Sequence, residues 1–135
     1  MRRSSIAVLV LLAACLSTLS ALPKRPMRIG DLFAMKRLSA PALSPDGKWV
    51  AYVVGTADLA SNKNTADLWI SAVDGSQTRR LTTNPASDGN PVWSPDGKWI
   101  AFESSRSGEG QIWMLPADGG GGEGHPLGGI SEGLG

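Results

Sequence analysis

The hydrophobic and polar positions of the chain repeat with a spacing of fifty residues. Residues 43–52, LSPDGKWVAY, return as residues 93–102, WSPDGKWIAF. In each copy a polar segment precedes a run of strand-forming residues with apolar side chains on both faces. A strand that faced water on one side would alternate apolar and polar residues, so each run predicts a strand covered on both faces. A repeat of this length predicts a repeat architecture.

The polar segment of each copy predicts a tight turn. Proline presets φ at the second turn position, serine can bond the backbone ahead of it, and glycine accepts positive φ. The predicted turn residues are Ser44, Pro45, Asp46 and Gly47 in the first copy, and Ser94, Pro95, Asp96 and Gly97 in the second. No second carboxylate lies at ligand spacing beside Asp46 or Asp96, so both are interpreted as turn residues rather than as calcium ligands or catalytic groups.

Two further strands are predicted after each hairpin. Residues 67–75 match residues 111–119, with a tryptophan at the same place and an Asp-Gly turn signal at the end of each. A more polar segment follows at 77–82, and residues 123–128 stand in its place in the second copy. Pro126 lacks an amide donor, which suits an edge strand.

The unit is therefore predicted to be four antiparallel strands, the size of one blade of a β-propeller. The fold class is all-β, with two four-stranded antiparallel blades of an incomplete propeller at residues 41–82 and 83–128. All five tryptophans fall inside the repeat and are predicted to fill the space between blades: Trp49, Trp69, Trp93, Trp99 and Trp113. A long polar loop is expected at residues 55–66 and a shorter one at 105–110.

The first 22 residues predict a signal peptide. Arg2 and Arg3 precede an apolar run at 6–16 that is too short for a membrane span. Two forms of processing stay open. Cleavage follows Ser20 or lies a residue or two beyond it, or residues 12–15 act as a lipobox in which Cys15 is lipidated. Either form predicts an exported protein, periplasmic or secreted, and the second adds a lipid anchor.

The segments on either side of the blades predict little regular structure. Residues 23–40 are interpreted as a linker with a short helix over 28–38, in which Asp31 is the N-cap. Residues 39–43 are expected to form the innermost strand of the first blade. Nine of the last 17 residues are glycine, so residues 129–135 are interpreted as a truncated, glycine-rich end.

The charge and the cysteine content argue against several classes of binding partner and site. The net charge is +1, and it becomes about −1 without the two arginines of the signal, so no nucleic-acid partner is predicted and membrane contact is expected only through a lipid anchor. Cys15 is the only cysteine, which excludes an intrachain disulfide and a cysteine metal cluster. No metal site and no cofactor are predicted.

The run DLFAMKRLS at 31–39, followed by the first hairpin, resembles the start of the propeller in bacterial serine peptidases of the prolyl oligopeptidase family, in particular the dipeptidyl and acylaminoacyl peptidases. The resemblance covers residues 27–128. The hairpin phrase also occurs in TolB-type propellers with WD40-like repeats. The resemblance implies a propeller that caps an α/β-hydrolase domain with a Ser-Asp-His triad and limits entry to peptide substrates. It carries no catalytic residue onto this chain, whose single histidine, His125, lies on a glycine- and proline-rich outer strand.

Three hypotheses follow. The chain is the N-terminal propeller part of an exported serine peptidase, without catalysis of its own. Alternatively, it belongs to a TolB-like periplasmic propeller that binds protein partners, or it is a truncated fragment without a function. Propellers typically close with 4–8 blades, so two blades are expected to leave two apolar faces uncovered.

Overall fold

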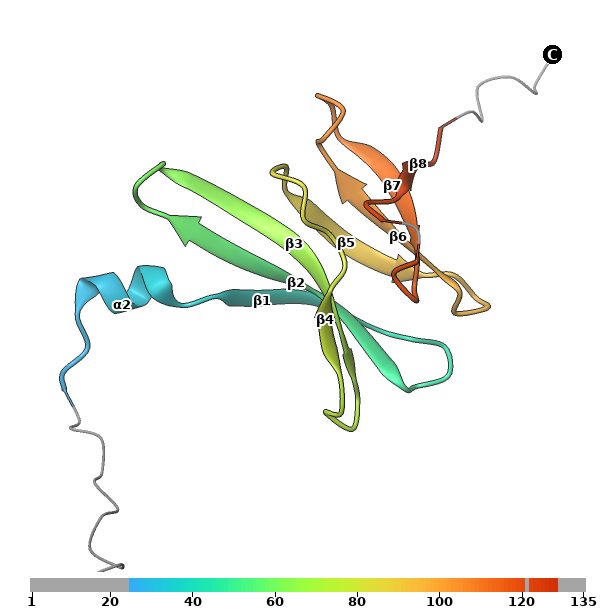
Figure 1. Cartoon of the computed structure of the whole chain (residues 1–135), viewed down its shortest axis with the longest axis horizontal. Coiled ribbons are helices and arrows are strands. Elements are labelled where there is room, and N and C mark those ends of the chain that lie inside the picture. The colour runs from blue at the N-terminus through green and yellow to red at the C-terminus, as the bar shows by residue number, and fades with distance from the viewer. Residues whose placement is uncertain (1–24, 121, 129–135) are drawn as a thin grey trace, which may run out of the picture.

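The computed structural model describes residues 25–120 and 122–128. The described residues form one helix and eight strands: α2 (Ile29–Ala34), β1 (Arg37–Leu43), β2 (Trp49–Asp58), β3 (Lys63–Ala72), β4 (Thr78–Arg80), β5 (Asp88–Trp93), β6 (Trp99–Ser104), β7 (Gln111–Pro116) and β8 (His125–Pro126). They make two antiparallel sheets in strict chain order, β1-β2-β3-β4 and β5-β6-β7-β8 (Figure 1). The all-β prediction with two four-stranded blades is confirmed, and we call the sheets blade 1 and blade 2.

The two middle strands of blade 1 are longer than the sequence predicted. Residues 55–66 were expected to form a loop, and that expectation was wrong. The β2–β3 ladder continues to the pair Asp58↔Lys63, so only a four-residue turn remains between the strands. This turn is held by Asp58, whose carboxylate accepts from the amide of Ala60 at 2.9 Å and from the hydroxyl of Ser61 at 2.6 Å. Threonine at positions 56 and 65 suits an extended, half-exposed strand despite its polarity.

The helix is shorter than predicted and begins differently. Its N-cap is Arg28, so the assignment of Asp31 as N-cap was wrong. Asp31 lies in the first turn, where its carboxylate accepts from the Arg28 amide at 2.7 Å and pairs with the Arg25 guanidinium at 2.7 Å. The Arg25 guanidinium, followed by the Arg28 amide, lowers the pKa of Asp31. The chain leaves the helix early because Arg37 already pairs with Gly55 of the lengthened β2.

The innermost strand of each blade carries the same irregularity. The register shifts between Ser39 and Ala42 in β1, and between Gly89 and Val92 in β5. Inside each shift one residue that is not glycine takes a positive φ, 48° at Ala40 and 50° at Asn90. A bulge of this kind bends a strand and increases its twist.

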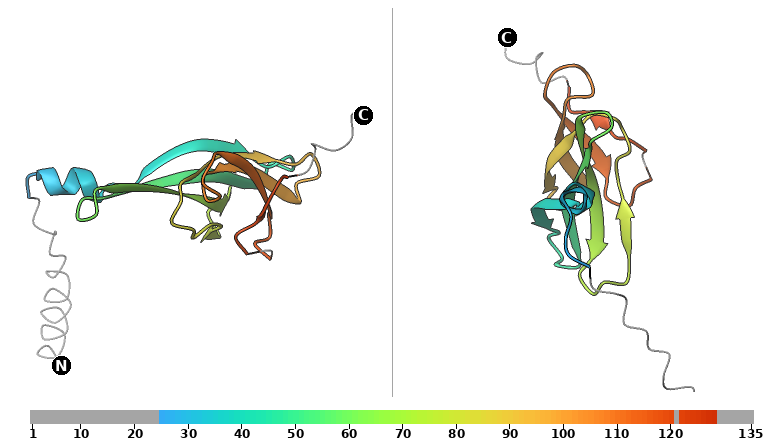
Figure 2. Two further views of the ribbon diagram at one scale, coloured as in Figure 1. Left: turned by 90° about the horizontal axis from the view of Figure 1, so that it is seen from above. Right: turned by 90° about the vertical axis from the view of Figure 1, so that its left-hand side faces the viewer.

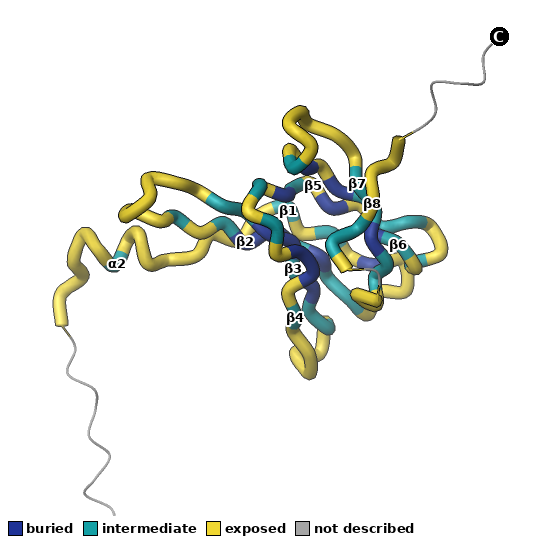
Figure 3. The backbone as a smooth tube through the Cα atoms, turned by 45° about the horizontal axis from the view of Figure 1, so that its top comes forward, coloured by how far each residue is buried: buried dark blue, intermediate teal, exposed yellow. Residues whose placement is uncertain are grey.

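The core lies between the two blades (Figure 3). Its buried members are aliphatic apart from one phenylalanine: Ala51, Val53, Leu68, Ile70, Leu81, Ile100, Phe102 and Leu115. The tryptophans are only partly buried. Trp49, Trp93 and Trp113 pack against this core from its rim, whereas Trp69 and Trp99 do not belong to it. Figure 2 shows that α2 projects beyond both sheets, and none of its residues is buried.

Candidate functional site

The two predicted turns have the same hydrogen bonds. In blade 1, the Ser44 hydroxyl donates to the Asp46 carboxylate at 2.6 Å and accepts from the Trp49 amide at 2.9 Å, and the Lys48 amide donates to Asp46 at 3.0 Å. In blade 2, the corresponding distances among Ser94, Asp96, Trp99 and Lys98 are 2.5, 3.0 and 3.0 Å. The glycines that follow have φ of 71° and 70°. Pro45 and Pro95 lie beside their carboxylates in one hollow between the turns, of about 360 Å³.

The carboxylates of these turns are occupied by their own backbone. The hydroxyl of Ser44, followed by the amide of Lys48, lowers the pKa of Asp46, and the hydroxyl of Ser94 with the amide of Lys98 does the same for Asp96. A carboxylate with these partners is ionised and already hydrogen-bonded, which suits a structural turn better than proton transfer.

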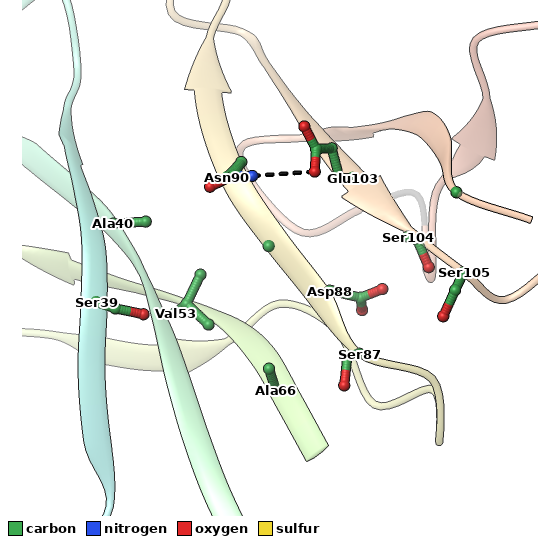
Figure 4. Close-up of a pocket in the computed structure, with 12 residues that line it drawn as sticks. Ser39, Ala40, Val53, Ala66, Ser87, Asp88, Asn90, Glu103, Ser104 and Ser105 are labelled. Carbon is green, nitrogen blue, oxygen red and sulfur yellow. Dashed lines mark hydrogen bonds between the residues drawn. The ribbon is translucent and has the colours of Figure 1, made fainter. Parts of the chain in front are cut away.

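An open groove lies between the inner strands of the two blades (Figure 4). Its volume is about 390 Å³. Blade 1 contributes small side chains from β1, β2 and β3, and blade 2 contributes polar ones from β5 and the end of β6. These lining residues include Ser39, Ala40, Ser87, Asn90, Glu103 and Ser105. The amide nitrogen of Asn90 donates to the Glu103 carboxylate at 3.0 Å across this surface.

The bulges position this groove. Ala40 and Asn90 both line it, and both are the residue with positive φ in their strand. The bulges thus place the hydroxyl of Ser39 and the amide of Asn90 at the groove, next to the carboxylate of Glu103 on β6. Among the described residues that line the groove, no hydroxyl and histidine come together as a nucleophile and its base would.

Beside the groove, Arg106 is buried in an ionic network. Its side chain is 5% exposed, and one guanidinium nitrogen donates to the fully buried carboxylate of Asp88 at 2.7 Å. A second nitrogen donates to the carbonyl of Glu123 at 2.6 Å. The guanidinium also lies over the Trp113 ring, 4.8 Å from its centroid. A buried cation needs this set of partners, because an unpaired charge in the interior is costly.

Glu123 extends the network to Thr83 and Asn84, in the segment that connects the two blades. Its carboxylate accepts from the amide and hydroxyl of Thr83, the amide at 2.7 Å, and from the amide of Asn84 at 3.2 Å. Burial raises the pKa of Glu123, but the bonds from Thr83 and Asn84 outweigh burial, so its pKa lies below the usual value. The outer edge of blade 2 is thereby fastened to the linker from blade 1.

The sequence interpretation missed this network. Arg106 lies in the segment 105–110, which was described only as a short polar loop. The one available signal was an arginine between serines, directly after a strand whose residues face the core. Its partners lie 17 and 18 positions away, and no local pattern joins them.

Side chains also join the two blades directly. The indole nitrogen of Trp93 in β5 donates to the carbonyl of Ala42 in β1 at 2.8 Å. From the other edge, Arg79 in β4 donates to the carbonyl of Ala117 at 2.6 Å and also to that of Asp118. The first bond joins the inner strands of the two blades, and the second joins the outer strand of blade 1 to the turn after β7. Side chains therefore connect the blades at both edges of their interface.

Trp69 and Trp99 face other partners. The amine of Lys36 lies 5.9 Å from the centroid of the Trp69 ring, and the His125 ring meets Trp99 edge-on at 5.8 Å. His125 is exposed on the edge strand, where no acidic side chain or nucleophile is hydrogen-bonded to it among the described residues. Pro126, on the same edge strand, pairs with Trp113 of β7.

Among residues 25–120 and 122–128, no three His, Cys, Asp or Glu side chains gather as a metal site would require. No helix in this part of the chain is long and apolar enough to cross a bilayer. Cys15, the predicted signal peptide and the end at 129–135 lie outside the described residues, so their assignments stay predictions.

The glycine-rich end also contains a serine with a glycine two positions away on each side. Gly129-Ile130-Ser131-Glu132-Gly133 has the spacing Gly-x-Ser-x-Gly of a nucleophile elbow. The pattern identifies a nucleophile only on a sharp turn between a strand and a helix. It stands here in a segment where glycine makes up about half of the residues, which yields such matches by composition, and we assign it no role.

A family model described as the TolB β-propeller domain matches residues 30–131. The chain belongs to this family. The chain is also 39% identical over 83 residues to dipeptidyl-peptidase 5 of Porphyromonas gingivalis, an alignment that covers 61% of this chain and 12% of the relative. It is 50% identical over 50 residues to the Tol-Pal system protein TolB of Anaeromyxobacter dehalogenans, covering 37% of this chain and 10% of the relative.

Among solved structures, a second peptidase is similar to this TolB-type propeller. Acylaminoacyl peptidase of Pyrococcus horikoshii superposes with a TM-score of 0.52 at 32% identity, over 64% of this chain and 13% of that one. The recognition of a propeller related to those of the prolyl oligopeptidase family is confirmed. The chain spans only 10% to 13% of the length of these relatives, so their full activities do not transfer with the fold.

Proposed function

We propose that this chain is the N-terminal part of the propeller of an exported serine peptidase. In this proposal a hydrolase domain elsewhere in the longer protein cleaves peptides, and the propeller limits which substrates reach it. The residues that the structure describes are not expected to supply the triad.

The observation that carries the proposal is the length of the matching segment. The dipeptidyl-peptidase 5 relative aligns over 83 residues, which exceeds one repeat, whereas the TolB relative aligns over 50 residues, the length of one repeat. A blade-sized phrase is shared by many propellers, so the longer alignment is the more specific one. Among the curated relatives it favours the peptidase over the TolB-like binding protein, whereas the family model over residues 30–131 describes the propeller that both share.

The groove between β1 and β5 supports a role in admitting peptides. Its wall offers hydroxyl, amide and carboxylate groups to a passing chain, and the small side chains of Ala40 and Ala66 leave room for one. A peptide backbone presents donors and acceptors at every residue, so a wall of this kind binds it weakly along its length. Export through the predicted signal peptide would place this activity in the periplasm or outside the cell.

Labelling with a fluorophosphonate probe tests the proposal. The longest product of the gene that contains this chain is expected to react with the probe and to hydrolyse peptide p-nitroanilides. The 135-residue chain is expected to do neither. A Ser131→Ala variant is the matched control, because labelling that this change removes would make Ser131 a nucleophile.

Two results would overturn the proposal. A gene product that contains further blades but remains unlabelled and inactive would favour a binding propeller. Labelling of the 135-residue chain would contradict the claim that catalysis lies outside it.

A further inference from the structure

The Asp-Gly turns of the two blades are structurally equivalent. In blade 1 the amide of Val73 donates to Lys48 at 2.9 Å and that of Gly75 to Ala72 at 2.9 Å, and in blade 2 the amides of Ala117 and Gly119 make the same bonds at 2.8 and 3.0 Å. Both glycines have a φ of 77°. The carbonyls of Val73 and Asp74 therefore correspond to those of Ala117 and Asp118.

In blade 2 this turn receives an arginine from the neighbouring blade. Arg79, on the outer strand of blade 1, donates to the carbonyls of both Ala117 and Asp118. Its guanidinium lies so close that a Cβ added to Gly119 would be 3.0 Å from one of its nitrogens. The planar fork of arginine fits two adjacent carbonyls in a way that a lysine amine does not.

In blade 1 the equivalent turn is open. A Cβ added to Gly75 would meet nothing within 4 Å, and no described residue donates to the carbonyls of Val73 or Asp74. The turn borders a hollow of about 450 Å³, whose wall includes Trp49 and Gln77.

The face of blade 1 beside this turn is also more polar than its equivalent. The hydroxyls of Tyr52, Ser71 and Thr78 form a chain with distances of 2.9 and 2.8 Å. By strand register, Tyr52 and Ser71 correspond to Phe102 and Leu115 of blade 2, which are buried against blade 1. A partner on this side of blade 1 therefore meets hydrogen-bonding groups where blade 2 meets apolar ones.

We propose that the turn of Val73 and Asp74 is an acceptor site for an arginine on the outer strand of a further four-stranded unit. The proposal rests on the proposed function, since it requires blades beyond residue 128. It adds the chemistry of the contact: a guanidinium that donates to two main-chain carbonyls, as Arg79 does within this chain.

A second copy of the chain is a poor occupant, for a reason that supplies the test. By register, Arg79 pairs with Ile70 and His125 with Met114, so His125 holds the position of Arg79 on blade 2. A neutral imidazole has one N–H donor, and it cannot serve two carbonyls as a guanidinium does. Replacing His125 by arginine would give the chain both halves of the contact.

Sedimentation velocity of the purified chain over a range of concentrations measures the effect. The His125→Arg variant is expected to associate head to tail about tenfold more tightly than the parent chain, in keeping with two charge-assisted hydrogen bonds. His125→Lys has the same charge without the fork, and it is expected to stay within about threefold of the parent.

The acceptor is tested in the His125→Arg background. Gly75→Val cannot keep a φ of 77° without strain, so it displaces the two carbonyls and is expected to return association to the parent level. Asp74→Lys places a cation beside the incoming guanidinium and provides a second acceptor variant if Gly75→Val fails to fold.

Unchanged association of His125→Arg, equal tightening by His125→Lys, or tightening that survives both acceptor variants would each overturn the proposal. These readings do not depend on a hydrolase domain, so they are separate from the labelling that tests the proposed function.

Discussion

The two blades repeat one sequence pattern, but each buries the opposite face. Leu68 in β3 and Ile112 in β7 hold the same register position, yet Leu68 is 0% exposed and Ile112 is 42% exposed. Leu81 and Leu127 repeat this contrast at 9% and 47%. The difference arises because blade 2 covers the Leu68 face, while no described residue covers that of Ile112. A residue of this repeat is therefore buried by its neighbour and not by its own sheet.

The largest effect is expected at the buried ion pair of blade 2. Arg106→Ala should lower the free energy of unfolding by about 3–5 kcal/mol, because it leaves the fully buried Asp88 without a counter-charge. Thr56→Ala, at the equivalent and exposed position of blade 1, should change it by less than about 0.5 kcal/mol. Urea unfolding followed by tryptophan fluorescence measures both, and a loss below about 1 kcal/mol for Arg106→Ala would show that the network is not stabilising.

The next effect addresses the contrast between the blade faces. Leu68→Ala should cost about 2–5 kcal/mol, because it opens a cavity between the blades. Ile112→Ala should cost about 1 kcal/mol or less, because the side chain already contacts water. In a longer product with a third blade, the cost of Ile112→Ala should rise to that of Leu68→Ala. Equal costs in the present chain would contradict the one-sided burial.

The next effect concerns the hairpin turns, in which the two blades are alike and not different. Ser44→Ala and Ser94→Ala each remove a bond to a carboxylate and leave a tryptophan amide without its acceptor, so each should cost about 1–2 kcal/mol. The two losses should agree within about 0.5 kcal/mol in urea unfolding, and a larger gap would mean that the turns are not equivalent.

The same turns predict a dependence on pH. The pKa values of Asp46 and Asp96 are lower in the folded chain than in the unfolded one. Their contribution is therefore complete above the unfolded pKa of about 3.9 and is lost as the pH falls through the folded values. The double variant Asp46→Asn, Asp96→Asn should show a shallower loss of stability as the pH falls below about 4, and a slope equal to that of the parent would contradict this assignment.

The smallest effect is expected at the bulges. Ala40 has a φ of 48°, which favours glycine, so Ala40→Gly should raise stability by about 0.5–1 kcal/mol. Asn90→Gly should give no gain, because asparagine tolerates this φ and its side chain bonds Glu103 at 3.0 Å. Thermal unfolding separates the two variants, and a gain at Asn90 as large as at Ala40 would show that the bond to Glu103 contributes nothing.

The parts of the fold that the sequence predicted depend on neighbours along the chain. The turn from Ser44 to Gly47 is determined by its own four residues, and its copy fifty positions later repeats it bond for bond. Blade membership followed from the same repetition. Among the strands, the ends at 55–66 were misplaced, because pairing between β2 and β3 overrides the polar composition of both.

The parts that the sequence did not predict depend on contacts across the chain. The groove requires the spacing of β1 and β5, and the bulges at Ala40 and Asn90 give no signal beyond the proline that follows each. In the sequence, Arg106 and Glu123 do not differ from other polar residues. Only the fold brings Arg106 to both Asp88 and Glu123. The tryptophans were expected to fill the space between the blades, but mainly aliphatic residues fill its centre, with Trp49, Trp93 and Trp113 at the rim and Trp69 and Trp99 outside it.

The strict chain order of both sheets also has a consequence for the order in which the blades fold during synthesis. Every strand of blade 1 pairs with a neighbour in sequence, so the sheet can form as soon as residue 82 is available, before any of blade 2 exists. Its partner blade requires about 50 more residues, which at ribosomal rates takes roughly 3–10 s. During that interval the apolar face that contains Leu68 and Ile70 is exposed to solvent. A binding chaperone acting on a newly made chain would have its main target here, and the need for it would end when blade 2 has formed.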